Sequence, residues 1–289
     1  WSSDVCSSDL LEIFIHFQNG KYNFIGQKGD TYPQQKPLND NAISISMDAQ
    51  MLLNGISRSL FATADDELRP VMNGVYFDIH TDDLTFVASD GHKLVRLRNL
   101  AVKSPERASF ILPKKPANLL KNLLAKESEQ VLIKFDDNNA YITCTNFEMV
   151  CRLIEGRYPN YNSVIPQENP FKVTIDRISF LNALKRVSVF SNPASSLVKL
   201  HLKDSLITVS AQDIDFSTSA EERIVCQFDG TELSIGFKAT YLIEILGNIS
   251  SEEIVLELAD PSRAGLIVPS ENDEDEDLLM LLMPMMLND

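Results

Sequence analysis

The sequence predicts an α+β fold in which one domain design is repeated, each copy with antiparallel sheets and two helices on one face. Three short motifs recur at offsets between 123 and 130 residues. Solenoid repeats are about 20–50 residues long, so a unit of this length is a whole domain. Two complete copies and part of a third fit into 289 residues. The recurring motifs are Asp90 with Asp213, Tyr32-Pro33 with Tyr158-Pro159, and residues 43–46 with 173–176.

Clusters of proline and polar residues near 37–41 and 166–170 mark the predicted boundaries between the copies. We therefore expect a remnant of a first domain at 11–40, a second domain at 41–167 and a third at 168–289. Residues 1–10 have neither the basic start and apolar core of a signal peptide nor the alternation of a strand. They resemble translated sequencing-adapter sequence, so we expect them to be non-native and the natural protein to begin upstream.

The predicted strands come in hairpins and short runs. Residues 11–17 and 22–25 are expected to form a hairpin closed by Asn19-Gly20 in a type I′ turn. The same design recurs at 131–135 with 141–145, and at 254–258 with 266–268. Further strand-like segments lie at 74–79, 84–89, 94–99, 197–202, 206–211 and 216–228. Each complete copy is thus expected to run strand, helix, three strands, strand, helix, three strands.

Apolar residues at helical spacing predict four amphipathic helices, at 48–60, 116–124, 177–190 and 240–249. Pro116 is expected at the first position of the second helix, where its missing N–H is not needed. Cations lie on the polar side or at the start of three helices, either to solvate them or to make a weakly positive face. These cations are Arg58, Lys114, Lys115, Lys121, Lys185 and Arg186.

Composition excludes several classes of protein. A net charge of −15 argues against tight binding of nucleic acid over the whole surface. The four cysteines form no CxxC pair, which argues against a zinc site or disulfide framework and fits a reducing cytosol. The longest uncharged apolar run, 278–287, is shorter than the about 20 residues of a membrane span. We therefore expect a cytoplasmic protein without a membrane segment, and a solvated loop at the acidic run 271–277.

Few residues suggest catalysis. Ser89, Asp90 and His92 lie together, but no G-x-S-x-G elbow surrounds the serine, and one local group does not define a triad. A structural turn or a place on a binding surface accounts for them better. Four methionines near the C-terminus suit either a core strand or a pliable surface for partners, namely Met280, Met283, Met285 and Met286.

Seven motifs carry a resemblance: Phe61-Ala62-Thr63-Ala64, Leu68-Arg69-Pro70, Asn73-Gly74, Ser89-Asp90-Gly91-His92-Lys93-Leu94, Glu155-Gly156-Arg157-Tyr158-Pro159-Asn160-Tyr161, Ile235-Gly236-Phe237 and Met283-Pro284-Met285. In this order they closely resemble the bacterial sliding clamp family, the beta subunit of DNA polymerase III. The resemblance implies a DNA-clamp fold, in which two subunits of three similar domains form a ring with helices inside and sheets outside. It also implies a DNA polymerase processivity factor that encircles duplex DNA without reading its sequence, and no enzymatic activity, cofactor or metal.

The resemblance further implies that the replicative DNA polymerase, the clamp loader and other clamp-motif proteins dock a short, largely apolar peptide between the second and third domains. A rim of methionine and proline around a leucine-sized recess suits such peptide anchors. The six helix-borne cations named above would face the DNA, attracting it weakly enough to permit sliding. Carried over by motif, the pocket residues are Met72, Ser89, Gly91, His92, Lys93, Leu94, Pro159, Val164, Tyr241, Ser262, Met283, Pro284, Met285 and Met286.

The chain departs from the family pattern at three places. Lys93 stands where many relatives have arginine, which removes a bidentate donor. Met286 replaces the arginine of a common Met-Pro-Met-Arg-Leu ending. Family rings are homodimers closed head to tail, first domain against third, so a chain with only a remnant of the first domain is expected to be mainly monomeric. Two alternatives remain: an acidic β-rich protein-binding adaptor that does not encircle DNA, and a hydrolase that uses Ser89 and His92.

Overall fold

The computed structural model describes residues 4–7, 11–32 and 37–287. They belong to two compact units, Trp1–Asn39 and Asp40–Asp289, each of which is described by itself. The predicted non-native segment therefore lies partly outside the described residues, as does Pro33 of the repeated Tyr-Pro motif. Its described part, β1 (Asp4–Ser7), forms a strand where the sequence predicted none.

The N-terminal unit contains a three-stranded antiparallel sheet in the order β1-β2-β3, followed by a short 3-10 turn, η1 (Gly29–Thr31). The predicted hairpin is confirmed as β2 (Glu12–Phe17) and β3 (Gly20–Ile25). The predicted type I′ turn is wrong, because Phe17 pairs with Gly20 and neither Asn19 nor Gly20 has a positive φ. The turn therefore consists of Gln18 and Asn19, one residue earlier than the Asn-Gly signal suggested.

The larger unit consists of two copies with the same order of elements, as the sequence predicted. The central copy contains β4 (Ile43–Asp48), α1 (Ala49–Ser59), β5 (Gly74–Ile79), β6 (Leu84–Ser89), β7 (Lys93–Asn99), β8 (Ala108–Pro113), α2 (Lys114–Leu124), β9 (Gln130–Phe135), β10 (Asn139–Thr143) and β11 (Glu148–Arg152). The C-terminal copy contains β12 (Phe171–Asp176), α3 (Arg177–Val187), β13 (Leu197–Lys203), β14 (Leu206–Asp213), β15 (Thr218–Val225), β16 (Leu233–Lys238), α4 (Ala239–Gly247), β17 (Glu253–Leu258), β18 (Gly265–Pro269) and β19 (Glu276–Leu282).

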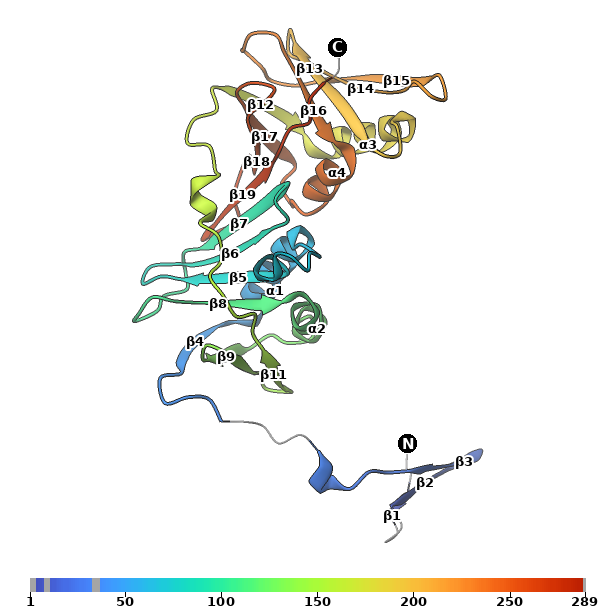
Figure 1. The fold of residues 1–289 in the computed structure, drawn as a ribbon, viewed down its shortest axis with the longest axis vertical. Coiled ribbons are helices and arrows are strands. Elements are labelled where there is room, and N and C mark those ends of the chain that lie inside the picture. The colour runs from blue at the N-terminus through green and yellow to red at the C-terminus, as the bar shows by residue number, and fades with distance from the viewer. Residues whose placement is uncertain (1–3, 8–10, 33–36, 288–289) are drawn as a thin grey trace. The chain divides into compact units, whose positions relative to one another are not determined.

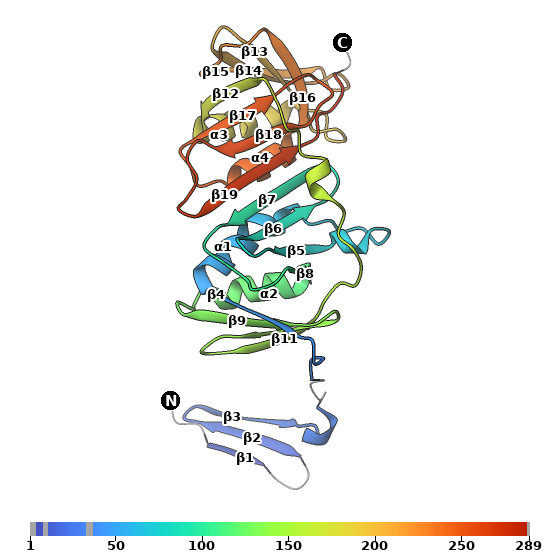
Figure 2. The same cartoon turned by 90° about the vertical axis from the view of Figure 1, so that its left-hand side faces the viewer.

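Strand pairing is also the same in the two copies. The ladders β11-β10-β9-β4 and β19-β18-β17-β12 correspond, as do β7-β6-β5-β8 and β15-β14-β13-β16. The copies meet where β7 pairs with β19 in antiparallel register from Asn99↔Glu276 to Lys93↔Leu282. This pairing joins a ladder from each copy into one eight-stranded sheet, which Figure 2 shows face on.

All four helices of this unit lie on the same side of the sheets (Figures 1 and 2). Helix α1 packs against α2 and helix α3 against α4. Their apolar faces and the facing strands form one continuous core that crosses both copies and includes Leu52, Leu120, Phe180 and Leu242. The observed arrangement is the predicted α+β design with helices on one face.

The helices begin where short-range signals place them. The Asp48 carboxylate accepts hydrogen bonds from the N–H groups of Gln50 and Met51, and Asp176 accepts one from Ser179, so both are N-caps. Helix α2 begins two residues before the predicted Pro116, which therefore lies in the first turn rather than at the first position. Proline is tolerated there because first-turn N–H groups have no partner within the helix.

A linker between the copies, residues 153–170, crosses the opposite side of the sheet from the helices (Figures 1 and 2). It contains a 3-10 turn, η4 (Tyr161–Ser163), and its aromatic rings pack on β5, with Tyr76 and Tyr158 stacked at 4.6 Å between centroids. A second apolar cluster forms here, from Leu94, Tyr158, Tyr161, Ile165 and Leu281 among others. The linker therefore covers the joint of the two copies on this side. None of the described helices is long and apolar enough to cross a membrane.

Candidate functional site

The β6–β7 hairpin has a tight turn that aims two side chains toward the C-terminal copy. One oxygen of the Asp90 carboxylate accepts hydrogen bonds from the N–H groups of His92 (2.8 Å) and Lys93 (2.9 Å). Gly91 has φ +91°, a conformation that side chains rarely adopt, and a Cβ there would lie 2.9 Å from the Arg69 guanidinium. The turn is thus held by side-chain hydrogen bonds, and its geometry depends on the glycine.

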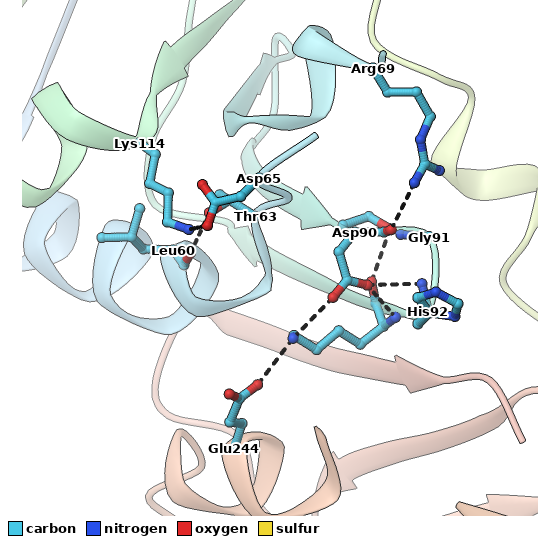
Figure 3. Close-up of polar contacts among 11 residues, drawn as sticks. Leu60, Thr63, Asp65, Arg69, Asp90, Gly91, His92, Lys114 and Glu244 are labelled. Carbon is cyan, nitrogen blue, oxygen red and sulfur yellow. Dashed lines mark hydrogen bonds and ion pairs between the residues drawn. The ribbon is translucent and has the colours of Figure 1, made fainter. Parts of the chain in front are cut away.

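Lys93 reaches across the joint of the two copies. Its Nζ lies 3.0 Å from a carboxylate oxygen of Asp90 and 3.0 Å from one of Glu244, which belongs to helix α4. Figure 3 shows these two carboxylates at the two ends of the contact. The Lys93 side chain is only 6% exposed. Burial by itself lowers the pKa of Lys93, but the hydrogen bonds that its ammonium group donates to Glu244 and Asp90 outweigh this effect, so the net pKa lies above its ordinary value.

The ring of Tyr241, on the first turn of α4, lies beside the hairpin. It is stacked on the His92 ring at 6.0 Å between centroids. The ammonium groups of Lys93 and Lys238 lie 4.2 and 4.7 Å from its centroid, within the range of cation–π attraction. Tyr241 is therefore held by residues from both copies.

The chain beyond β19 passes along the same place. The N–H of Met283 donates to the carbonyl oxygen of His92 (2.8 Å), and the N–H of Met285 donates to that of Gly236 in β16 (2.8 Å). Met283 and Met286 are exposed, while Pro284 and Met285 are half-buried. Met280, two residues before the end of β19, is fully buried in the core. The methionine cluster is thus divided: Met280 belongs to a core strand, while Met283 and Met286 are accessible at the surface.

The remaining predicted pocket residues differ in burial and in the element that carries them. Leu94 is buried in the outer apolar cluster, and Pro159 and Val164 lie on the linker with exposed side chains. Ser262 lies in an exposed turn, where its hydroxyl and N–H both donate to Asp260. Met72 is buried at the end of the 3-10 turn η3 (Pro70–Met72). The structure therefore brings His92, Lys93, Tyr241 and Met283 into one group.

Ser89, the candidate nucleophile of the hydrolase alternative, is buried and hydrogen-bonded within its own turn. Its hydroxyl donates to the carbonyl oxygen of Lys93 (2.9 Å) and accepts from the N–H of Gly91 (3.1 Å). His92 directs its ring to Tyr241 instead. This geometry is that of a hairpin turn, without the nucleophile–base hydrogen bond that a triad needs.

The acidic run 271–277 is a solvated loop over residues 271–275, as the sequence predicted, but Glu276 and Asp277 are half-buried in β19. Arg58 of α1 forms ion pairs with Asp273 and with Glu276 (3.0 Å), and Arg96 of β7 pairs with Asp277 (2.8 Å). Arg58 and Glu276 are 15% and 7% exposed. The run therefore fastens the two copies together, because three of its acids meet arginines of the central copy.

Half of the six predicted DNA-facing cations have acidic partners. Besides Arg58, Lys114 pairs with Asp65 (2.5 Å, Figure 3), and Arg186 forms a bidentate pair with Glu222. No ion pair is present among the described residues for Lys115, Lys121 and Lys185, which lie on α2 and α3 with exposed or half-buried side chains. The helical face thus offers fewer free cations than the sequence suggested.

Lys238 and Glu244 contact this group, yet the sequence analysis did not name either as a site residue, and it named Asp90 only for a turn or a binding surface. Glu244 and Lys238 were recognisable only as polar residues on and before a predicted helix, and nothing local pairs either with the β6–β7 hairpin. Within the described part of the chain, no group of three or more histidine, cysteine, aspartate or glutamate side chains could hold a metal ion.

Comparison with known proteins identifies similar domains. Sequence models of the DNA polymerase III beta subunit match this chain, the central domain over residues 46–160 and the C-terminal domain over residues 162–286. The beta sliding clamp of Pseudomonas aeruginosa is 28% identical over 247 residues, 85% of this chain and 66% of that protein. That of Staphylococcus aureus is 26% identical over 277 residues, 95% of this chain and 73% of that protein. The chain thus spans about two thirds of the length of these relatives.

Solved structures agree. A DNA polymerase III subunit beta from Pseudomonas aeruginosa, bound to griselimycin, matches with a TM-score of 0.92 at 25% identity, over 99% of this chain and 76% of that chain. The DNA polymerase sliding clamp of Bacillus subtilis matches with a TM-score of 0.90 at 25% identity, over 99% of this chain and 75% of that chain. These similarities confirm the DNA-clamp fold that the sequence motifs implied.

Proposed function

We propose the function of a ring-shaped DNA polymerase processivity factor for this chain, which belongs to the DNA polymerase III beta subunit family of bacterial sliding clamps. In this proposal the chain supplies a second domain at 41–167 and a third at 168–289 to a ring around duplex DNA. The ring acts in the cytoplasm and tethers the replicative polymerase and other partners. It performs no catalysis and needs no cofactor.

One observation carries the proposal: two copies of one domain are joined edge to edge, with their helices on the same side. A contact that joins the end of one unit to the start of the next generates a ring when its rotation closes. Because the helices share one side, repetition of the β7–β19 joint lines the inside of such a ring with helices. The sheets and the linker then lie on the outside.

The repeat also suggests how a second copy closes the ring. Strand β15 corresponds to β7, yet in the described part of the chain it pairs only with β14 and forms an edge of its sheet. Next to it lies η5 (Ser188–Phe190), which exposes Val189 (78%) and Phe190 (39%). We infer that a strand equivalent to β19 from another subunit pairs with β15, giving a head-to-tail homodimer in the complete protein.

Partner proteins would dock at the group around His92, Lys93, Tyr241 and Met283. Exposed methionines beside an aromatic ring suit apolar peptide anchors, since methionine adapts its shape and buries apolar area at little cost. We propose this site for a clamp-motif peptide of the replicative polymerase or the clamp loader. By the same reasoning it is the site where griselimycin, which is bound to the Pseudomonas aeruginosa relative, would bind this chain.

Charged substitutions test the docking site. Replacing Met283 and Met285 by aspartate is expected to weaken binding of a fluorescein-labelled apolar pentapeptide with leucine and phenylalanine anchors by at least about tenfold, because it puts charge against an apolar ligand. Fluorescence anisotropy measures this change, and circular dichroism checks that the domains remain folded. Unchanged peptide binding by the folded variant would refute the site assignment.

A topological assay tests encirclement. The full-length protein of which this chain would be a part is loaded onto a nicked circular DNA, which is then linearised. A ring held by topology stays on the circle in high salt and leaves the linear DNA by its ends. Equal retention on both forms would reject encirclement, and absence of loading would favour the acidic protein-binding adaptor.

A further inference from the structure

Lys93 is a buried cation at the point where the pairing of the two copies stops. The last registered pair of the β7–β19 ladder is Lys93 with Leu282. Beyond it the chain makes one further contact with the hairpin, through Met283 and His92, and then leaves for β16. No strand pairing therefore holds helix α4 against the hairpin, although the docking site lies between them.

The Lys93 bridge takes the place of that missing ladder. Lysine is almost never buried unless its charge is paired, and here one carboxylate comes from each copy: Asp90 from the hairpin and Glu244 from α4. Both contacts are 3.0 Å long, within the range of an N–H···O hydrogen bond. Removal of the cation would leave the Asp90 and Glu244 carboxylates close together without a cation between them. This arrangement is unfavourable because their negative charges repel each other.

The bridge also orients the ring that forms one wall of the docking site. Tyr241 and Glu244 are three residues apart on α4 and so lie on the same helical face. The ion pair between Glu244 and Lys93 therefore holds the helical face that carries Tyr241 toward the hairpin. The ammonium group of Lys93 lies 4.2 Å from the centroid of the Tyr241 ring. His92, next to Lys93 in the hairpin, stacks on the same ring.

We propose that Lys93 is the positioning residue of the docking site: it ties Asp90 to Glu244 and holds the Tyr241 wall against the β6–β7 hairpin before a peptide arrives. The ligand is a short apolar peptide, and the inference rests on the proposed docking function. A site whose walls are already in place binds more tightly, because the peptide does not have to order them. Lys93 thus acts on affinity through Tyr241 rather than by contact with the peptide.

The test compares three substitutions in the chain as it exists, with the fluorescein-labelled apolar pentapeptide and griselimycin as probes. Lys93→Met keeps an unbranched apolar side chain without the ammonium group, and is expected to lower peptide affinity about tenfold. Lys93→Arg keeps both ion pairs and is expected to remain within about twofold of the original affinity. Glu244→Gln, at a more exposed position, is expected to lower affinity about threefold.

Two further measurements distinguish a positioning role of Lys93 from general destabilisation of the fold. One is the affinity of the double variant, and the other is the order of the methionines beside the docking site. In a chain that already carries Glu244→Gln, Lys93→Met should lower peptide affinity less than it does in the original chain, because the two residues act through one bridge. In ¹³C-methyl spectra, the Met283 and Met285 signals of Lys93→Met are expected to broaden well below the unfolding temperature. The control Lys126→Met, at an exposed lysine after α2, is expected to leave affinity and methyl signals unchanged.

The outcomes distinguish the two proposals. If the original chain binds neither probe, the docking function itself fails. If it binds, and Lys93→Met and Glu244→Gln both bind equally well, the positioning role is overturned while the docking site stands. An affinity loss in Lys93→Met that Lys93→Arg restores, together with altered methionine signals, supports the inference. Should Lys93→Met fail to fold, Glu244→Gln and Lys93→Arg decide the question.

Discussion

At the scale of single residues, Ser89 and Asp90 stabilise a turn by accepting hydrogen bonds from backbone groups. Asp90 accepts from His92 and Lys93, and Ser89 accepts from Gly91. In the sequence the same two residues, with His92, suggested a hydrolase. Their hydrogen bonds show that the serine and aspartate side chains hold the chain reversal that presents His92 and Lys93 to the other copy.

Ser89→Ala is expected to lower the free energy of unfolding by about 1 kcal/mol, because the partly buried Gly91 N–H loses its acceptor and the buried Lys93 carbonyl oxygen keeps only the Asp90 N–H as a donor. Urea unfolding followed by circular dichroism measures the change. Ser163→Ala is the matched control. The Ser163 hydroxyl donates to the Asn160 carbonyl oxygen on the surface of the linker, so its loss should change the free energy of unfolding less. Equal stability of Ser89→Ala and the original chain would contradict the role of the turn.

At the scale of secondary-structure elements, the joint between the copies depends on charge as well as on strand pairing. Strands β7 and β19 supply the backbone ladder, and the acidic run before and within β19 supplies carboxylates for arginines of α1 and β7. Burial raises the pKa of Glu276, the charge of Arg58 lowers it, and Asp273 raises it again, so that it lies above its ordinary value. The ionised form of Glu276 therefore depends on Arg58.

Arg58→Met is expected to lower the free energy of unfolding by about 2 kcal/mol at pH 7.5, because a buried carboxylate loses its cation. A carboxyl group with a raised pKa stabilises the fold below its ordinary pKa, and this contribution disappears as pH rises through the raised value. Without Arg58 the pKa of Glu276 rises further, so that more of its carboxyl groups are protonated and neutral at pH 5. The decrease in the free energy of unfolding caused by Arg58→Met should therefore be smaller at pH 5 than at pH 7.5.

Urea unfolding at the two pH values measures this difference. Arg152→Met serves as the control, because the Arg152–Glu155 pair is exposed on both sides and should contribute little at either pH. A loss for Arg58→Met that is the same at pH 5 and pH 7.5 would mean that Glu276 is not the group that Arg58 stabilises.

At the scale of the whole molecule, the charge distribution is compatible with the proposed ring, in which DNA would be held loosely. The net charge is −15, and three of the six helix cations are paired with acids of this same chain. A few remaining cations give a weak, salt-dependent attraction to phosphates. Retention on DNA would then come mainly from enclosure, which leaves the ring free to slide.

Two substitutions on the C-terminal copy are expected to change DNA retention in opposite directions. Lys185→Gln removes a cation without an acidic partner among the described residues and should shorten retention on nicked circles at low salt by about twofold. Glu222→Gln releases the Arg186 guanidinium and should lengthen it. Dissociation kinetics of the full-length protein measure both, with linearised DNA as the control. Changes of the same sign would contradict this account of the helical face.

Local patterns predicted much of the fold. The bounds of β5 and β6 agree with the predicted 74–79 and 84–89, and all four helices lie where apolar spacing placed them. The motifs also indicated His92, Lys93 and Met283 as neighbours. The hairpin turn was misplaced by one residue, because pairing across the whole hairpin, rather than the Asn-Gly signal, sets the register.

The sequence by itself determined the order of elements, the repetition of one domain design and the family, since periodicity and motifs are local properties of the chain. Only the tertiary structure decided which charges meet: Lys93 with Glu244, Arg58 with Glu276, and Arg186 with Glu222. Ion pairs require partners within about 4 Å, and residues far apart in sequence reach that distance only after the sheets have joined. For that reason the acidic run looked like a loop in the sequence and fastens two domains in the fold.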